Sequence, residues 1–264
     1  MVSGDEHTPA PSGPTRSPIL QVQDLTWGVG GFTILEDIDL EVAAGEFLSI
    51  IGPNGAGKSS LLNVISGTNV PRRGTVALDG SDITSRRPAH RVRRGLGRTF
   101  QTSSLFPGLS LVENARLAAQ AARGGSLSLI ARPRWGDDAT QAGLEALTEV
   151  ELADRADDDV ADLSHGDKRK LEIALLLCSD PDVLLLDEPT AGVSVEEVDP
   201  LVEVIRRVHE RGRTVVMVEH RMDLVVDVSD RIAVLHNGRL LTVGTPAEVM
   251  ADPVVQSAYL GEAA

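Results

Sequence analysis

The stretch GPNGAGKSS, at residues 52–60, constrains the fold of this chain more than any other feature. It follows the apolar run FLSII and precedes LLNVISG, whose apolar residues have helical spacing. A strand, a glycine-rich loop and a helix form the context of a P-loop, in which backbone N–H groups and the helix N-terminus together face a phosphate. A glycine-rich turn with a purely structural role would rarely carry every fixed residue of this motif. The sequence therefore predicts an α/β fold with a nucleotide site at this loop.

Both the backbone and the side chains of this loop can contribute to binding a nucleotide. The glycines let the backbone wrap closely around a phosphate. The ammonium group of Lys58 can reach the β- and γ-phosphates, and the hydroxyl of Ser59 can bind Mg²⁺. We expect the nucleotide to be held by Gly52, Pro53, Asn54, Gly55, Ala56, Gly57, Lys58, Ser59 and Ser60.

Two adjacent carboxylates end the apolar run in VLLLDEPT, at residues 183–190. Four apolar residues predict a strand buried on both faces, and parallel sheets bind ligands at the C-terminal ends of their strands. Asp187 is predicted to hold Mg²⁺ directly or through water. Glu188 points elsewhere and suits a base or a positioning group for an attacking water. Such acids are often only solvated, but their combination with the P-loop favours the catalytic interpretation.

The rest of the chain is predicted to form one domain behind a tail. Residues 1–18 are rich in Pro, Ser, Gly and Thr and are predicted to be disordered, whereas residues 19–264 are predicted to fold as a single domain. Strands alternating with helices predict a parallel sheet with helices on both faces, and residues about 103–180 read as a helical insert. A basic cluster fits either a solvated helix face or a binding patch; it comprises Arg86, Arg87, Arg91, Arg93 and Arg94.

Composition argues against several classes of protein. Lys and Arg number 25 against 39 Asp and Glu, so the net charge of −14 opposes non-specific binding to nucleic acid or anionic lipid. Aromatic residues make up only 3%, which is too few for a protein that stacks on single-stranded bases. The longest apolar run has six residues, so no membrane span is expected.

Three further motifs, in the correct order, resemble those of the ATP-binding-cassette (ABC) ATPases. LSHGDKRKLEIALLL is similar to the family's signature, usually LSGGQ, with His165 and Asp167 replacing a glycine and the glutamine. Gln101 in GRTFQTSSLF matches the Q-loop, and His220 in VMVEHRMDL matches the switch histidine. Alone, a Ser-x-Gly helix start would be read as an N-cap, and a lone Gln or His as structural. Their order around the P-loop reverses that interpretation.

The resemblance covers residues about 20–262 and implies the ABC ATPase fold. That fold has a P-loop core with a parallel sheet, an N-terminal antiparallel β subdomain and a helical insert. It also implies ATP hydrolysis by two subunits that close head-to-tail around two ATP molecules, each P-loop meeting the partner's Ser164 and Gly166. The implied catalytic residues are Glu188, His220 and Gln101, and the implied Mg²⁺ ligands are Ser59, Gln101 and Asp187.

This chain departs from the family pattern at two places besides the signature. The aromatic residue that stacks on adenine aligns with Val29, so we expect either an aliphatic contact there or a substitute contact from Trp27, with Phe32 less favoured. In the stretch AGVS, Ser194 stands where many relatives have aspartate or asparagine, which puts communication between subunits in doubt.

Longer stretches resemble particular importers. GLGRTFQTSSLFPGLSLVENARLAA and GTPAEVMADPVVQSAYLGE are similar to ATPases of branched-chain (hydrophobic) amino-acid importers, whereas SHGDKRKLEIALLL is closer to the urea and short-amide branch. The resemblance implies two membrane-spanning permease subunits, a second ATPase subunit, identical or related, and indirectly an extracytoplasmic solute-binding protein. It places the chain peripherally on the cytoplasmic face of the cell membrane.

Two other functions compete with the importer interpretation. Soluble ABC ATPases of DNA repair or translation usually carry a long coiled-coil insertion or two cassettes, which 264 residues do not accommodate. A non-hydrolytic regulatory module would not need the complete set of Lys58, Asp187, Glu188 and His220.

Overall fold

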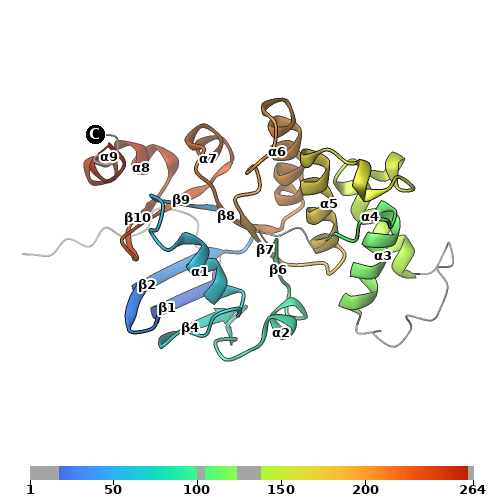
Figure 1. Cartoon of the computed structure of the whole chain (residues 1–264). Helices are drawn as coiled ribbons and strands as arrows, with labels where there is room; N and C mark the ends of the chain where they lie inside the picture. The colour runs from blue at the N-terminus through green and yellow to red at the C-terminus, as the bar shows by residue number, and fades with distance from the viewer. Residues whose placement is uncertain (1–17, 100–104, 124–137, 261–264) are drawn as a thin grey trace, which may run out of the picture.

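The computed structural model describes residues 18–99, 105–123 and 138–260 (Figure 1). Gln101 and most of the predicted tail lie outside these ranges. The tail boundary was predicted one residue too late, because Pro18 already begins the first strand and pairs with Ala43. Within the described ranges, no helix combines the length and the apolar character that a membrane crossing requires.

An antiparallel sheet forms the N-terminal part of the fold, as predicted. Its strands lie in the order β2-β1-β4-β5. Alternating apolar residues such as Leu20 and Val22 are buried on one face of β1, the period expected of a half-buried strand. The predicted Asp79-Gly80 turn joins β4 to β5. The strands are β1 (Pro18–Val29), β2 (Phe32–Ala43), β4 (Arg73–Leu78) and β5 (Ser81–Asp82).

A second sheet carries the motif-bearing strands. Its order is β10-β9-β3-β8-β7-β6, and all neighbours pair in parallel except β10, which is antiparallel to β9. Every residue of β3, β7 and β8 is buried, which explains their continuous apolar runs. The strands are β3 (Phe47–Ile51), β6 (Leu96–Arg98), β7 (Val183–Asp187), β8 (Thr214–Val218), β9 (Arg231–His236) and β10 (Arg239–Gly244).

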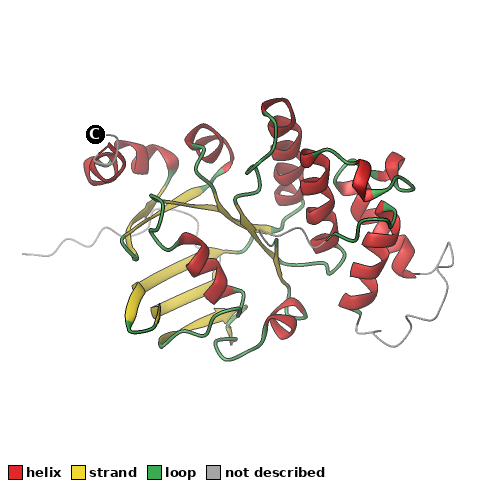
Figure 2. Ribbon diagram, in the orientation of Figure 1, coloured by secondary structure: helices red, strands yellow, loops and turns green. Residues whose placement is uncertain are grey.

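Helices cover both sides of this second sheet (Figure 2). Helix α1 (Lys58–Ile65) packs against strands of both sheets, β2 and β7. Three longer helices, α3 (Leu111–Ala122), α4 (Asp138–Glu149) and α5 (His165–Leu177), pack together and form the helical part of the predicted insert. Figure 1 shows α3 and α4 at the end of the molecule opposite α8 and α9. The remaining helices are α2 (Pro88–Val92), α6 (Val195–Glu210), α7 (Met222–Val228), α8 (Pro246–Ala251) and α9 (Pro253–Leu260), with 3₁₀ turns at Ala153–Arg155 and Val160–Asp162.

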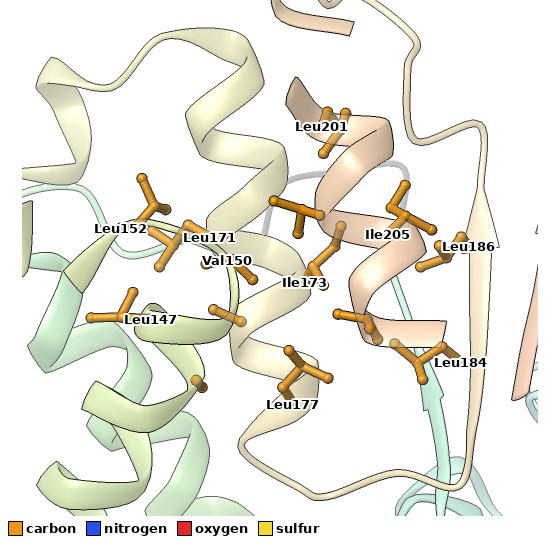
Figure 3. Packing of buried hydrophobic residues seen from close by; sticks show 14 of the residues in the cluster. Leu147, Val150, Leu152, Leu171, Ile173, Leu177, Leu184, Leu186, Leu201 and Ile205 are labelled. Atoms are coloured by element: carbon orange, nitrogen blue, oxygen red, sulfur yellow. The ribbon is translucent and has the colours of Figure 1, made fainter. Parts of the chain in front are cut away.

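Strand β7 separates two hydrophobic cores. Leu184 and Leu186 belong to one core, in which they face α5 and α6 (Figure 3). Val183 and Leu185 belong to the other, which contains the apolar side of α1 and the N-terminal sheet. Successive side chains of a strand point to opposite faces, so a single strand can line both cores.

In the basic cluster around α2, Arg91 belongs neither to a solvated helix face nor to a binding patch, the two interpretations predicted from the sequence. Arg91 is only 1% exposed, and its guanidinium donates to the carbonyl oxygens of Val64 and Ile65 at the end of α1. Burial lowers the pKa of Arg91 to about 10. Arg91 therefore caps the C-terminus of α1, where carbonyl groups lack helical partners and favour a cation.

Candidate active site

The P-loop connects β3 to α1 with the geometry that its motif predicts. A side chain at Gly52 is impossible, because an added Cβ would lie 2.0 Å from the carbonyl oxygen of Leu235 on β9. Gly57 is the N-cap of α1 and has a left-handed φ of 106°, which favours glycine. These constraints bring the loop backbone against β9 and direct the N-terminus of α1 toward the loop.

Lys58 folds back over this loop. Its Nζ donates to the carbonyl oxygens of Gly52 at 2.7 Å and Pro53 at 2.9 Å. The ammonium charge is thus held at the loop itself, next to the exposed residues Asn54 and Gly55. A positive charge in this position suits the β- and γ-phosphates of a nucleotide.

The hydroxyl of Ser59 and the carboxylate of Asp187 meet beside the P-loop. The Ser59 Oγ donates to the Asp187 Oδ1 at 3.1 Å, although 128 residues separate them in sequence. Hydroxyl and carboxylate oxygens are the hard donors that Mg²⁺ prefers. These two residues therefore fit a Mg²⁺ ion as two of its ligands.

Arg98 is a buried partner of Asp187 that sequence reasoning missed. Its Nη2 lies 3.0 Å from the Asp187 Oδ2, and the two side chains are 7% and 1% exposed. Its Nη1 donates to Asn63 Oδ1 at 2.7 Å and to Ser66 Oγ at 2.8 Å, both from α1 or its end. Burial lowers the pKa of Arg98, and the Asp187 carboxylate opposes that shift. Arg98 therefore ties Asp187 to α1; the only sequence signal was its place in GRTFQ.

Glu188 and His220 lie in direct contact. The His220 Nε2 is 2.7 Å from the Glu188 Oε1, which joins the ends of the neighbouring strands β7 and β8. Glu188 also has a φ of 50°, in the left-handed region that ordinary residues seldom adopt. The backbone N–H of Glu188 donates to the Val218 carbonyl at 2.9 Å, which holds this turn in place. Unusual backbone conformations of this kind gather at functional sites.

Glu219 is a second residue that the sequence interpretation missed. It is 3% exposed, and its Oε1 accepts hydrogen bonds from the Thr190 N–H at 3.0 Å and hydroxyl at 2.6 Å. Its Oε2 accepts from the backbone N–H of His220 at 3.0 Å. Glu219 thus fixes the segment after Glu188 relative to His220. The sequence signal for Glu219 was an acidic residue directly before a histidine at the end of a predicted strand.

We expect His220→Ala to lose most ATP turnover while retaining ATP affinity, because the ring lies against Glu188, whereas the charge that suits the phosphates is that of Lys58. A positioned side chain of this kind typically contributes about 10²-fold or more to rate. Phosphate release and the ATP dissociation constant measure the two effects separately. His236→Ala, at the end of β9, is the matched control. Near-normal turnover in His220→Ala would remove this histidine from the site.

The signature residues lie at the start of α5. Ser164 is the N-cap, and its hydroxyl accepts from the Asp167 N–H at 3.1 Å. Asp167, in place of the usual glutamine, is paired with Arg155 at 2.6 Å, which offsets its negative charge. Helix α5 packs with α3, α4 and α6, whereas α1 packs with β2 and β7. The signature and the P-loop therefore belong to different packed groups of the fold.

The predicted base contact lies at the tip of the β1–β2 hairpin. Val29 pairs with Phe32 across the turn, and the two side chains are 58% and 81% exposed. Trp27 is partly buried against the N-terminal core. Val29 is thus accessible to a base, and its role in adenine binding stays a prediction.

These features define an ATP-binding cassette, and comparison with known sequences agrees. The family model described as "ABC transporter" matches residues 35–191. The chain belongs to this family, whose cassettes hydrolyse ATP. A second family model, described as "Branched-chain amino acid ATP-binding cassette transporter", matches residues 239–264 and narrows the group.

Individual relatives match over nearly the whole chain. The high-affinity branched-chain amino acid transport ATP-binding protein BraF of Pseudomonas aeruginosa is 37% identical over 253 residues, covering 93% of this chain and 99% of BraF. The ADP conformation of MJ1267, an ATP-binding cassette of an ABC transporter, is 28% identical with a TM-score of 0.82, covering 93% of this chain and 99% of that one. The dimeric post-hydrolysis state of the cassette MJ0796, bound to ADP and phosphate, is 26% identical with a TM-score of 0.70, covering 86% and 98%.

Proposed function

We propose that this chain hydrolyses ATP to drive an importer of branched-chain or other hydrophobic amino acids. The observation that carries the hydrolytic part is the Glu188–His220 contact of 2.7 Å beside the Ser59–Asp187 pair. The likeness to BraF and the match of residues 239–264 support the amino-acid branch. The urea and short-amide branch has only the likeness of one stretch, SHGDKRKLEIALLL, in its favour.

In this proposal Glu188 accepts a proton from the attacking water. The water oxygen bonds to the γ-phosphorus while the bond to the β–γ bridging oxygen breaks, which yields ADP and phosphate. His220 orients Glu188 and the water, and Lys58 stabilises charge on the phosphate oxygens. Mg²⁺, when bound, would be held by Ser59 and Asp187, with Gln101 as a further ligand, and would neutralise phosphate charge.

Lys58→Ala is expected to abolish the thermal stabilisation of the chain by Mg²⁺-ATP, because the mutant loses the charge that binds the phosphates. A ligand present at 100 times its dissociation constant stabilises a protein by about 2.7 kcal/mol, so the wild-type shift should be clear. The melting temperature with and without Mg²⁺-ATP measures it. Lys168→Ala, on α5, is the control, and an unchanged shift in Lys58→Ala would contradict the nucleotide site.

The working assembly in this proposal contains two ATPase subunits and two membrane-spanning permease subunits. The ATPases close head-to-tail, so that Ser164 and Gly166 of one chain meet the γ-phosphate on the other. The likeness to the dimeric cassette MJ0796 supports pairing. The chain would lie peripherally on the cytoplasmic face of the membrane, and an extracytoplasmic solute-binding protein would deliver the solute to the permeases.

An uptake assay tests the solute. Cells that lack this chain should lose uptake of labelled leucine and regain it with the wild-type gene, but not with the Glu188→Gln gene. Loss of urea uptake with leucine uptake intact would assign the chain to the urea and short-amide importers instead. Loss of neither would favour a soluble ABC ATPase.

A further inference from the structure

The carboxylate of Glu197, on the first turn of α6, lies directly over the backbone of Gly166. A Cβ added to Gly166 would lie 2.8 Å from the Glu197 Cβ and 3.0 Å from its Oε1. Gly166 is buried as a result, while its neighbours Ser164 and His165 are exposed. The start of the signature helix is therefore covered by a side chain of another helix.

Glu197 is held in this position by a hydrogen bond from the start of its own helix. Ser194 Oγ, at the N-cap of α6, donates to the Glu197 Oε2 at 2.9 Å. The neighbouring Ser164 hydroxyl, the Ser194 hydroxyl and the Gly166 N–H lower the pKa of the Glu197 carboxyl. The Glu197 carboxylate lies beside the N-terminus of a 13-residue helix, where N–H groups lack helical partners and favour negative charge.

Under the proposed function, the same hydroxyl and N–H receive the γ-phosphate of the partner's ATP. The Glu197 carboxylate covers Gly166, so it and the phosphate compete for the space beside these donors. Two anions at one helix terminus also repel each other. The Glu197 carboxylate must therefore leave before the phosphate can bind.

We propose that Glu197 is an internal anion that occupies the signature site of the separate subunit and raises the ATP concentration needed for pairing. This inference rests on the head-to-tail arrangement of the proposed function. Release of Glu197 would also free Ser194, which is the residue that replaces the usual aspartate or asparagine. One carboxylate thereby links the signature to the segment that precedes α6.

If Glu197 has a purely structural role, a different result is expected. Glu197 stands three residues after Ser194, and its N–H donates to the Ser194 carbonyl at 3.0 Å, so its side chain could serve only to stabilise the start of α6. In that case its removal would lower thermal stability and leave ATP-driven pairing unchanged. Glu196, an exposed acid in the same turn, provides a control with the same change of charge.

The test measures ATP-driven association in a Glu188→Gln background, in which ATP persists. Sedimentation is recorded over a series of ATP concentrations for the full chain, alone and with the second ATPase that co-purifies with its membrane complex. Three proteins are compared: Glu188→Gln alone, with Glu197→Gln, and with Glu196→Gln. Thermal unfolding confirms that each is folded.

We expect Glu197→Gln to lower the ATP concentration at half-association by about tenfold, because a charged hydrogen-bonded competitor is removed. Glu196→Gln should leave it unchanged. An equal decrease in both variants, or no decrease in either, would overturn the role of Glu197 while leaving pairing intact. Absence of ATP-dependent association in Glu188→Gln alone would instead overturn the proposed pairing, and the inference with it.

Discussion

Glu188→Gln is expected to hydrolyse ATP about 10²- to 10⁴-fold more slowly than the wild type while still binding ATP. The amide has nearly the shape of the carboxylate and can keep a hydrogen bond to His220, so the fold of the site should persist. An amide nitrogen or oxygen is too weak a base to accept the proton of the attacking water. The loss should therefore fall on the chemical step.

Single-turnover phosphate release measures this step, and equilibrium binding of labelled ATP measures affinity. Glu196→Gln, an exposed acid on α6, is the control for loss of one negative charge. Wild-type turnover in Glu188→Gln would exclude Glu188 as the base. A parallel loss of affinity would indicate that the carboxylate contributes to nucleotide binding instead.

Arg98→Met is expected to lower the free energy of unfolding by about 3–5 kcal/mol, the usual effect of breaking a buried ion pair. The substitution leaves the Asp187 carboxylate, whose side chain is 1% exposed, without its cationic partner. It also removes the hydrogen bonds to Asn63 and Ser66, which connect β6 to α1. Methionine fills similar space, so the loss should come mainly from the uncompensated charge.

Urea unfolding monitored by circular dichroism measures this effect. Arg73→Met removes a comparable pair, with Asp37, but the two side chains are 63% and 46% exposed. Exposed pairs contribute about 0–1 kcal/mol, so this control should lose little. Equal losses in the two variants would show that burial of the Arg98–Asp187 pair does not decide its contribution. Adding Asp187→Asn to Arg98→Met should recover part of the stability, since the uncompensated charge of Asp187 is then removed as well.

The placement of Asp187, Glu188 and His220 was predictable because each stands at or just after the end of a strand. Parallel strands bring their C-terminal ends to one edge of a sheet, so Asp187, Glu188 and His220 had to lie near the P-loop. Their strands were recognisable as short apolar runs. The helices of the insert followed from spacing in the same way.

The supporting residues were not predictable by the same reasoning. Arg98, Glu219 and Glu197 act through partners on other elements, and no local spacing specifies which elements will meet. Arg91 illustrates the difficulty, because it stands among four exposed arginines in sequence yet is itself 1% exposed. Its side chain is buried against the end of α1, where it binds the carbonyl oxygen of Ile65, 26 residues earlier in the chain.

The position of β7 between two cores has a mechanical consequence. Residues on one face of this strand belong to the block that carries the signature helix, and those on the other face belong to the block that carries the P-loop helix. A displacement of Asp187, at the end of this strand, would therefore act on side chains of both cores. The two blocks are therefore coupled through the side chains of one strand, and a shift of β7 cannot change the packing of one core without changing that of the other.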